Sequence, residues 1–361
     1  MCADKKLDAL RSRIDVLDEQ IQQLISERAD CARQVAEVKT GQGENAEFYR
    51  PEREAEVLRR VSERNTGPLP VEEMVRLFRE IMSACLALEK PLSIAFFGPE
   101  GTFTQAAALK HFGHSVRTLA LDGIDTVFRE VEAGAADYGV VPVENSSEGV
   151  ITHTLDMFQR SPLGICGEVE LRIHHHLLAA DAERSGIRRV LAHQQALAQC
   201  RGWLDANLPH VERIAVASNA EAARLVVDQS DDAAIAGEMA AELYGLMTVA
   251  RNIEDQPDNT TRFLVIGNQR VLPSGVDKTS ILVSVHNAPG ALFSLLQPIA
   301  QNGISMTRIE SRPSRQGMWQ YVFYIDLEGH RDDAPVAAAL EELKKKAFVV
   351  RVLGSYPRAV L

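Results

Sequence analysis

The sequence predicts a multidomain protein with an all-α module, a two-lobed α/β module and an α+β module. Residues 1–90 contain 33 Lys, Arg, Asp or Glu residues but three of the 23 glycines, a composition typical of helices with wet outer faces. Residues 93–271 alternate short apolar runs with helical stretches, which indicates an α/β sheet. Residues 277–361 follow the order βαββαβ, the ferredoxin-like order.

Bulk composition excludes several classes of protein. The net charge of −11 over 361 residues argues against a dedicated nucleic-acid binder, which needs a basic face. No apolar run approaches the ~20 residues of a membrane span, and the N-terminus lacks the apolar core of a signal peptide. The five cysteines are odd in number and form no CxxC pair, which is typical of a reducing compartment. We therefore expect a cytoplasmic protein with no nucleic-acid or membrane partner.

The first predicted helix carries a long line of apolar residues, its seam, with cations on or near it. Its seam follows a 4-3-4-3 spacing through Leu10, Ile14, Leu17, Ile21, Leu24, Arg28, Cys31, Val35 and Val38. Around the helix axis, Lys39 is rotated about 20° from Arg28, so the two cations share one face. Arg11 is rotated about 260° from Arg28 and cannot lie on that face of the same helix. A helix of ~30 residues is ~45 Å long, so we expect its far end to reach a second copy of the chain. The alternative is that Arg28 only pairs with a buried glutamate.

The stretches LDALRSRIDVLDEQI, LISERADCARQVAEVK and YRPERE resemble the all-helical chorismate mutase family over essentially all of residues 1–90. The resemblance implies rearrangement of chorismate to prephenate, for which the enzyme needs positioned cations and no nucleophile. It implies that the mutase substrate is bound by Arg11, Arg28, Lys39, Arg53, Glu54, Cys85 and Glu89. Of these, we expect Arg28, Lys39 and Glu89 to be catalytic. Some family members have Ser and Gln where this chain has Cys85 and Glu89, so we expect mutase activity to fall as pH rises and Glu89 loses its proton.

In the middle region, polar residues cluster where predicted strands end. The stretch GPEGTFTQAA (98–107) follows a strand and opens a helix, whose free N–H groups favour an anion. The stretches VPVENSSEG (141–149), AHQQALAQC (192–200) and ASNAEAA (217–223) also follow or cap predicted elements. Ligands of open α/β sheets bind at such strand ends. Two lobes with these clusters predict a cleft like that of a periplasmic binding protein.

The ordered set GPxGTF, VPxENS, HxQxLxQC, SNAxAA and TRF resembles prephenate dehydratase over 93–271. The resemblance implies that Thr261 is catalytic, as a hydrogen-bond donor to the leaving hydroxyl while prephenate loses that group and CO2. It implies a binding set of Thr102, Phe103, Asn145, Ser146, Thr152, Ser218, Asn219, Ala220, Thr261, Arg262 and Phe263. We assign no chemistry to Glu100 or Glu144.

The run IHHH (173–176) invites a metal hypothesis. Adjacent side chains of a strand point to opposite faces, so three consecutive histidines cannot converge on one ion. We expect no metal and no cofactor, and interpret the run as a hinge between lobes. His193 is interpreted as structural rather than as a base.

The stretches NAPGALFSLL (287–296) and RIESRPS (308–314) resemble the ACT domain, an amino-acid-sensing unit, over 277–361. The resemblance implies that phenylalanine binds at Asn287, Gly290, Ala291, Leu292, Glu310, Ser311, Arg312 and Pro313. ACT domains generally pair side by side, which implies a homodimer or a higher oligomer. Feedback inhibition by L-phenylalanine is the functional expectation, and a purely structural dimerisation domain is the alternative.

The three resemblances together imply a bifunctional chorismate mutase–prephenate dehydratase of phenylalanine biosynthesis, with prephenate as product of one site and substrate of the other. Three alternatives stay open at this level. The middle module could prefer arogenate, the chain could be a small-molecule binding protein with a sensory domain, or the helical module could serve only to dimerise.

Overall fold

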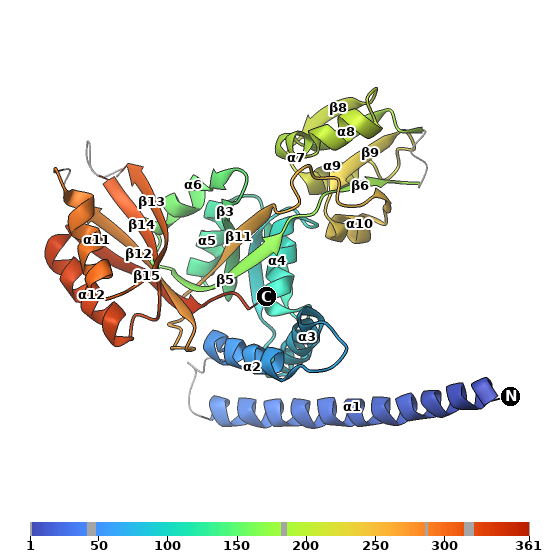
Figure 1. Cartoon of the computed structure of the whole chain (residues 1–361), viewed down its shortest axis with the longest axis horizontal. Coiled ribbons are helices and arrows are strands. Elements are labelled where there is room, and N and C mark those ends of the chain that lie inside the picture. Colours follow the sequence, from blue (N-terminus) through green and yellow to red (C-terminus); the bar gives the residue numbers. More distant parts are fainter. Residues whose placement is uncertain (1, 42–47, 182–185, 286–287, 314–320, 361) are drawn as a thin grey trace.

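The computed structural model describes residues 2–41, 48–181, 186–285, 288–313 and 321–360. Three bodies follow one another along the chain: a set of N-terminal helices, a two-lobed α/β module and a C-terminal α/β sandwich (Figure 1). The predicted fold class is therefore confirmed.

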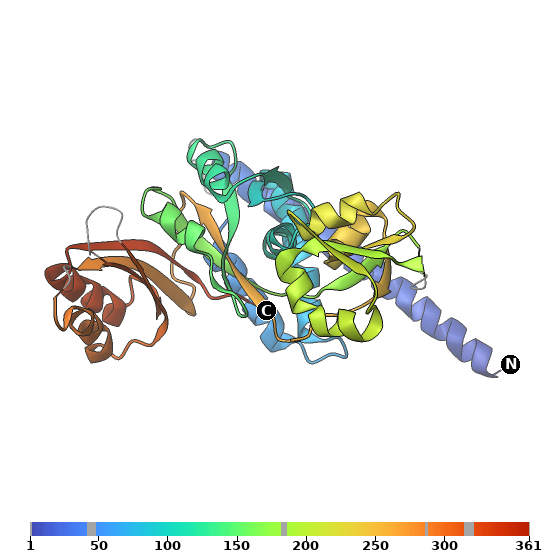
Figure 2. The ribbon, with the colours of Figure 1, turned by 90° about the horizontal axis from the view of Figure 1, so that it is seen from above.

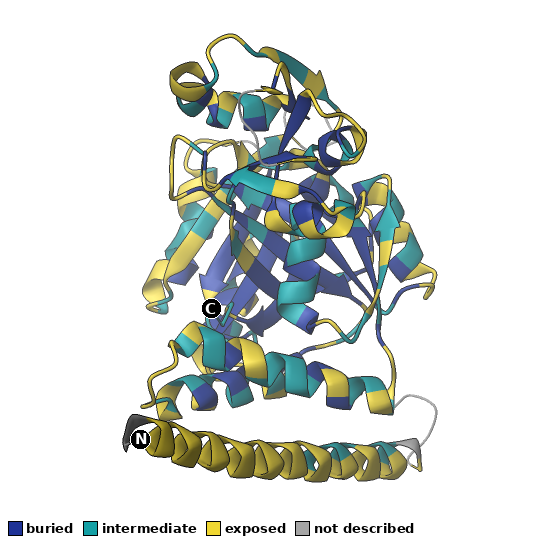
Figure 3. Ribbon diagram, turned by 90° about the vertical axis from the view of Figure 1, so that its right-hand side faces the viewer, coloured by how far each residue is buried: buried dark blue, intermediate teal, exposed yellow. Residues whose placement is uncertain are grey.

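The N-terminal module consists of α1 (Cys2–Thr40), α2 (Pro51–Arg64) and α3 (Val71–Glu89). Pro51 occupies the first turn of α2, where its missing N–H is no loss. Helix α1 extends far past its partners (Figure 1) and is exposed along almost all of its length (Figure 3). Its apolar seam is 39–64% exposed at Leu10, Ile14, Leu17, Ile21, Leu24, Val35 and Val38. In the part of the chain that the structure describes, no helix has the length and apolar character needed to cross a membrane.

The first lobe is built on a six-stranded mixed sheet in the order β2-β1-β3-β11-β5, with β4 paired to β3. Its strands are β1 (Ser93–Phe97), β2 (Arg117–Leu121), β3 (Tyr138–Asn145), β4 (Gly149–Val150), β5 (Gly164–Arg172) and β11 (Thr260–Gly267). Its helices are α4 (Phe103–Phe112), α5 (Ile124–Glu132) and α6 (Thr152–Phe158). Separate apolar clusters contain Phe96 with Phe263 and Phe128 with Leu264, because successive side chains of β11 face opposite sides of the sheet.

The second lobe has a five-stranded sheet in the order β10-β6-β9-β7-β8. Its strands are β6 (His176–Ala179), β7 (Arg189–His193), β8 (Glu212–Val216), β9 (Asp232–Ala236) and β10 (Met247–Ala250). Its helices are α7 (Gln194–Gln199), α8 (Arg201–Asn207), α9 (Asn219–Leu225) and α10 (Glu238–Tyr244). Two segments, 173–175 and 251–259, connect the lobes. The second brings β11 back into the first sheet between β3 and β5, so the last strand of the module is an internal strand of the first lobe.

The C-terminal module follows the predicted βαββαβ order. It contains β12 (Asp277–Val285), α11 (Ala291–Gln301), β13 (Met306–Pro313), β14 (Tyr321–Glu328), α12 (Ala334–Lys346) and β15 (Val349–Pro357), with the sheet order β13-β14-β12-β15. Both helices cover one face of the sheet, at the end of the molecule opposite the second lobe (Figure 2).

The other face of this sheet packs directly on the first lobe. Tyr324 and Leu353 belong to the same apolar cluster as Phe128 of the first lobe, and the Tyr324 hydroxyl donates to the Leu155 carbonyl at 2.6 Å. At Gly354 a Cβ atom would meet the backbone of Ile165, so β15 crosses β5 with main chain against main chain. The C-terminal module therefore packs directly on the first lobe through a shared apolar cluster.

Candidate active sites

A cleft of about 800 Å³ lies between the two lobes of the middle module. Its walls come from both sheets, so either lobe alone would leave it open. Eight residues of the predicted dehydratase set line it: Thr102, Phe103, Asn145, Ser218, Asn219, Ala220, Thr261 and Phe263.

Thr261 and Asn145 form a hydrogen-bonded pair on this wall. They face each other across the paired strands β11 and β3, and Asn145 Nδ2 donates to Thr261 Oγ1 at 2.8 Å. The orientation of the amide is fixed because Asn145 Oδ1 accepts the N–H groups of Ser147 and Glu148 at 3.0 and 3.1 Å. Since Thr261 Oγ1 accepts this bond, its own hydrogen is available to another acceptor. The pair therefore presents a placed hydroxyl donor to the cleft.

The turn before α4 forms the second part of the wall. Gly101 has φ of 80°, a conformation that favours glycine, and added bulk there would contact Ala240 and Leu243 of α10. Thr102 precedes the helix and its hydroxyl donates to the Pro99 carbonyl at 2.9 Å. The turn of one lobe thus packs against a helix of the other, with the start of α4 facing the cleft.

The second lobe contributes the start of α9 and one cation. Ser218 caps α9 by accepting the Glu221 N–H at 3.0 Å, and Asn219 Oδ1 accepts the His193 N–H at 2.9 Å. Arg224 lines the cleft on the same helix. The sequence analysis missed Arg224, although it follows Ala220 by four residues and so shares its helical face.

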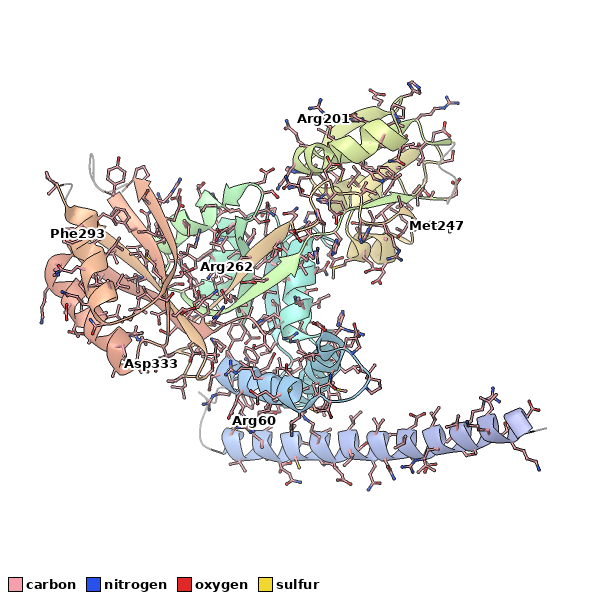
Figure 4. All side chains as sticks on the ribbon, in the orientation of Figure 1. Arg60, Arg201, Met247, Arg262, Phe293 and Asp333 are labelled. Atoms are coloured by element: carbon pink, nitrogen blue, oxygen red, sulfur yellow. The ribbon has the colours of Figure 1, made fainter. Side chains whose placement is uncertain are left out.

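Three residues of the predicted dehydratase set are not part of the cleft lining. Ser146 Oγ accepts the Thr260 N–H at 3.0 Å, and Thr152 begins α6. The interpretation of Arg262 as a substrate ligand needs correction, because its guanidinium lies on the opposite face of β11 from Thr261. It contacts Glu168 and Asp326 at the junction with the C-terminal module (Figure 4).

The histidines of the run 173–176 have separate partners. His174 Nδ1 lies 2.7 Å from Glu254 Oε1, His175 Nε2 lies 2.9 Å from Gln199 Oε1, and His176 Nδ1 accepts the N–H of Asn252 at 3.1 Å. Burial lowers the pKa of His175. Across the described residues there is no group of three potential metal ligands.

In the N-terminal module, Arg28, Lys39 and Glu89 gather near the end of α3. Lys39 Nζ lies 3.8 Å from Glu89 Oε2 and donates to the Phe48 carbonyl at 3.1 Å. Burial raises the pKa of Glu89, and the charges of Lys39 and Arg28 oppose that rise. Cys85, one helical turn earlier, is buried. The group combines two cations with a carboxyl that retains its proton to higher pH than usual.

The remaining predicted mutase ligands are not in this group. Arg11 pairs with Asp8 at 3.7 Å on the exposed surface, about 26 Å along α1 from Arg28 at 1.5 Å per residue. Arg53 is also exposed and pairs with its helix neighbour Glu56. Within one chain, Arg11 and Arg53 therefore do not join Arg28, Lys39 and Glu89.

The prediction that Glu54 belongs to the mutase pocket disagrees with its position. Its carboxyl lies 3.8 Å from Arg79 and lines a small cavity, about 30 Å³, at the junction of the helices with the first lobe. Burial raises the pKa of Glu54 to about 7, against the lowering effect of Arg79. Adjacent positions on a helix differ by 100°, so Arg53 and Glu54 face different surroundings.

The residues predicted to bind phenylalanine lie on two elements of the C-terminal module. Gly290, with φ of 79°, caps α11 and is followed by Ala291 and Leu292. Glu310, Ser311, Arg312 and Pro313 lie on β13, at the edge of the sheet. Arg312 Nη2 lies 3.2 Å from Asp156 on α6. Asn287 lies outside the described residues.

Fold and sites together define a multifunctional enzyme with a regulatory domain. Three family models match the chain: chorismate mutase type II over residues 10–90, prephenate dehydratase over 94–271, and the ACT domain over 279–345. The bifunctional chorismate mutase/prephenate dehydratase of Stutzerimonas stutzeri is 61% identical over 99% of both chains, and that of Pseudomonas aeruginosa is 59% identical over the whole of both.

A crystal structure of prephenate dehydratase from Arthrobacter aurescens, in complex with L-Phe, matches with a TM-score of 0.69 and 36% identity. The match covers 75% of this chain and 93% of that one. This chain belongs to the bifunctional chorismate mutase/prephenate dehydratase family. It is an enzyme that joins a mutase module, a dehydratase module and an ACT domain in one polypeptide.

Proposed function

We propose that the chain rearranges chorismate to prephenate in its helical module and converts prephenate to phenylpyruvate in the interlobe cleft, under control of L-phenylalanine. The observation that supports the dehydratase half best is the Asn145–Thr261 pair, which holds a hydroxyl donor in the wall of a cleft large enough for prephenate.

Thr261 donates to the departing hydroxyl, and its orientation is set by the amide of Asn145. A threonine is too weak an acid to transfer its proton freely, but a placed donor stabilises the negative charge that builds on the leaving oxygen. Phe263 lies two residues after Thr261 on the same face of β11 and packs beneath the ring of the substrate. Formation of the aromatic ring drives loss of CO2.

The start of α4 and the side chain of Arg224 bind the carboxylates of the substrate. Free N–H groups at a helix start attract an anion, and Arg224 supplies a full charge from the opposite lobe. With contacts from both lobes, the substrate closes the cleft over itself and excludes water from the reacting centre.

The mutase reaction takes place where Arg28, Lys39 and Glu89 meet. The cations hold the two carboxylates of chorismate and stabilise charge on the migrating ether oxygen. Protonated Glu89 donates a hydrogen bond to the same oxygen. A second copy of the chain supplies Arg11, because the Arg11 of the same chain lies too far along α1.

A homodimer follows from the exposed seam of α1. Seven apolar side chains of that seam are at least 39% exposed, and pairing with the same surface of a second copy removes them from water. The edge strand β13 offers a second surface for pairing. The proposal places the enzyme in the cytoplasm, where thiols such as those of Cys31 and Cys200 stay reduced.

L-Phenylalanine acts on the ACT domain in this proposal. The Arthrobacter aurescens relative was crystallised with L-Phe, and Gly290 leaves room beside the start of α11 for a small ligand. A ligand that prefers a less active arrangement inhibits by shifting the population toward it.

A coupled assay tests the proposal. Purified protein is mixed with chorismate, and prephenate and phenylpyruvate are measured separately. Arg28→Ala should abolish prephenate formation but convert added prephenate, and Thr261→Ala should accumulate prephenate. Wild-type protein that leaves chorismate unchanged would overturn the mutase assignment, and full turnover by Thr261→Ala would overturn the role of that residue.

A further inference from the structure

The strands that bear Thr261 and Asn145 also contact the ACT domain. On β11, Thr261 faces the cleft and the next residue, Arg262, faces the ACT sheet. On β3, Asn145 faces the cleft and the preceding residue, Glu144, reaches the ACT sheet. Thr261 and Asn145 are therefore each one residue away from a contact with the ACT domain.

These contacts link a set of four charged residues, two from the dehydratase module and two from the ACT domain. Arg262 Nη1 lies 2.6 Å from Asp326 Oδ2, and Arg308 Nε lies 3.1 Å from Glu144 Oε2. Arg262 and Glu144 are direct cross-strand partners in the dehydratase sheet, and Arg308 and Asp326 are direct cross-strand partners in the ACT sheet. Two neighbouring strands of one domain are thus joined to two neighbouring strands of the other.

The Arg262 side of this set is buried and fully bonded. The side chains of Arg262 and Asp326 are 11% and 7% exposed. Arg262 Nε donates to Glu168 at 2.9 Å and its Nη2 donates to the Tyr356 hydroxyl at 3.0 Å. Although burial acts to lower it, the pKa of Arg262 is raised by Tyr356, Asp326 and Glu168. The guanidinium therefore has a separate partner for each nitrogen, which holds β11 in one position.

Arg308 makes fewer hydrogen bonds of good geometry than Arg262 does. Among the described residues, Nε and Nη2 of Arg308 are buried without a hydrogen-bond partner of good geometry, although Nε is close to Glu144. Arg308 lies on β13, two residues before the Glu310–Pro313 stretch. On the same strand Arg312 contacts Asp156 of the dehydratase module. A small movement of β13 would change both contacts.

We propose that Asp326 and Arg308 of the ACT domain are positioning residues for dehydration, and that they act on Thr261 and Asn145 through Arg262 and Glu144. This inference rests on the proposed dehydratase function. In it, the ACT domain holds the catalytic strands in the active arrangement, and β13 transmits the effector signal. An unfavourable shift of about 1 Å costs on the order of 100-fold in rate, so a small displacement of β13 is sufficient for inhibition.

The first test measures whether Asp326 acts through Thr261. Asp326→Asn keeps the shape of the side chain but removes the negative charge beside Arg262 Nη1, while Glu168 stays on Nε. We expect dehydratase kcat to fall at least about tenfold with KM within about twofold. In a Thr261→Ala background the same change should alter the residual rate less than about twofold, because groups that act as a unit are not additive. A fall of equal size in both backgrounds would show a general structural effect and overturn the proposal.

Two controls accompany this test. Arg270→Ala breaks an exposed ion pair with Asp332, 3.0 Å long, that also joins the two domains but is remote from the cleft. It should leave dehydratase turnover unchanged; a loss equal to that of Asp326→Asn would count against the proposal. Mutase turnover of each preparation reports folding. Wild-type turnover of prephenate tests the dehydratase function itself, so its failure is separate from failure of the inference.

The second test concerns transmission by β13. Arg308→Met should bind L-phenylalanine normally in calorimetry, but saturating L-phenylalanine should inhibit its dehydratase turnover at least about tenfold less than it inhibits the wild type. The double variant with Glu144→Arg and Arg308→Glu reverses the pair and should recover inhibition that Arg308→Glu alone loses. Unchanged inhibition of Arg308→Met would overturn the role of this contact. An unresponsive wild type that also fails to bind phenylalanine would instead overturn the sensor function.

Discussion

Asn145 donates a hydrogen bond from Nδ2 to Thr261 Oγ1 at 2.8 Å, across the paired strands β3 and β11. The same amide nitrogen lies 2.8 Å from Asn259 Oδ1. The Thr261 hydroxyl therefore has an assigned acceptor role toward Asn145 and keeps its hydrogen for the cleft. A change in the polarity of Asn145 should therefore act on the reaction through its contact with Thr261, and it also alters the contact with Asn259.

Asn145→Asp tests that bond with almost no change in volume. A carboxylate accepts but does not donate, so the Thr261 hydroxyl would turn its hydrogen toward residue 145 and away from the substrate. We expect dehydratase kcat to fall by about 100-fold, as for loss of one placed donor, with mutase turnover as the internal control. Steady-state kinetics with prephenate measures both kcat and KM. An Asn145→Asp variant as active as wild type would refute the orientation assigned to Thr261.

The pH dependence of the mutase should follow Glu89. Burial raises its pKa while Lys39 and Arg28 oppose the rise, so the donating, protonated form persists above the usual pH range of a carboxyl. Activity that needs this proton is full below the raised pKa and falls as pH increases through it. We expect mutase kcat to decline toward alkaline pH and Glu89→Gln, which donates at every pH, to flatten the profile. A flat wild-type profile from acid to alkaline pH would contradict this role.

Arg224 should affect binding more than chemistry. Its side chain is 60% exposed and 4.0 Å from Glu221, so its attraction for a carboxylate is partly screened by solvent. We expect Arg224→Ala to raise the dehydratase KM about fivefold, equivalent to ~1 kcal/mol for an exposed pair, with kcat nearly constant. Arg188→Ala is the matched control, because Arg188 is 81% exposed on the same lobe and does not line the cleft. Equal kinetics for the two variants would exclude Arg224 from substrate binding.

The contrast between Thr261 and Arg262 indicates how far sequence reasoning reaches. Local periodicity is enough to predict the βαββαβ order of the C-terminal module, and motif resemblance is enough to bring Thr261, Asn145 and Phe103 to one cleft. The partner of Arg262 depends on how a second sheet packs on β11, which no local pattern encodes. Motif resemblance therefore grouped Arg262 with its neighbours, although alternate residues of a strand face opposite sides.

The same limit applies to the helical module. The 4-3-4-3 spacing predicted the seam of α1, and the geometry of one helix placed Arg11 out of reach of Arg28. Which way Glu54 faces depends instead on the packing of α2 against the first lobe, where it meets Arg79. Arg224 was missed because its helix was interpreted only by its N-terminal polar residues.

Mixed subunits provide the sharpest test of a shared mutase site. If Arg11 of one copy completes the site formed by Arg28 and Lys39 of another, Arg11→Ala and Arg28→Ala chains should each be inactive alone. In a mixed dimer one site loses both arginines and the other retains both. Random exchange of equal amounts makes half of the dimers mixed, so about a quarter of wild-type mutase activity should return. Dehydratase turnover should stay constant throughout, because the cleft is built within one chain.

Light scattering before and after exchange verifies the dimer, and Leu24→Lys, which charges the exposed seam, should prevent both dimer formation and recovery. Two inactive variants that remain inactive after verified exchange would show that Arg11 does not act across the dimer.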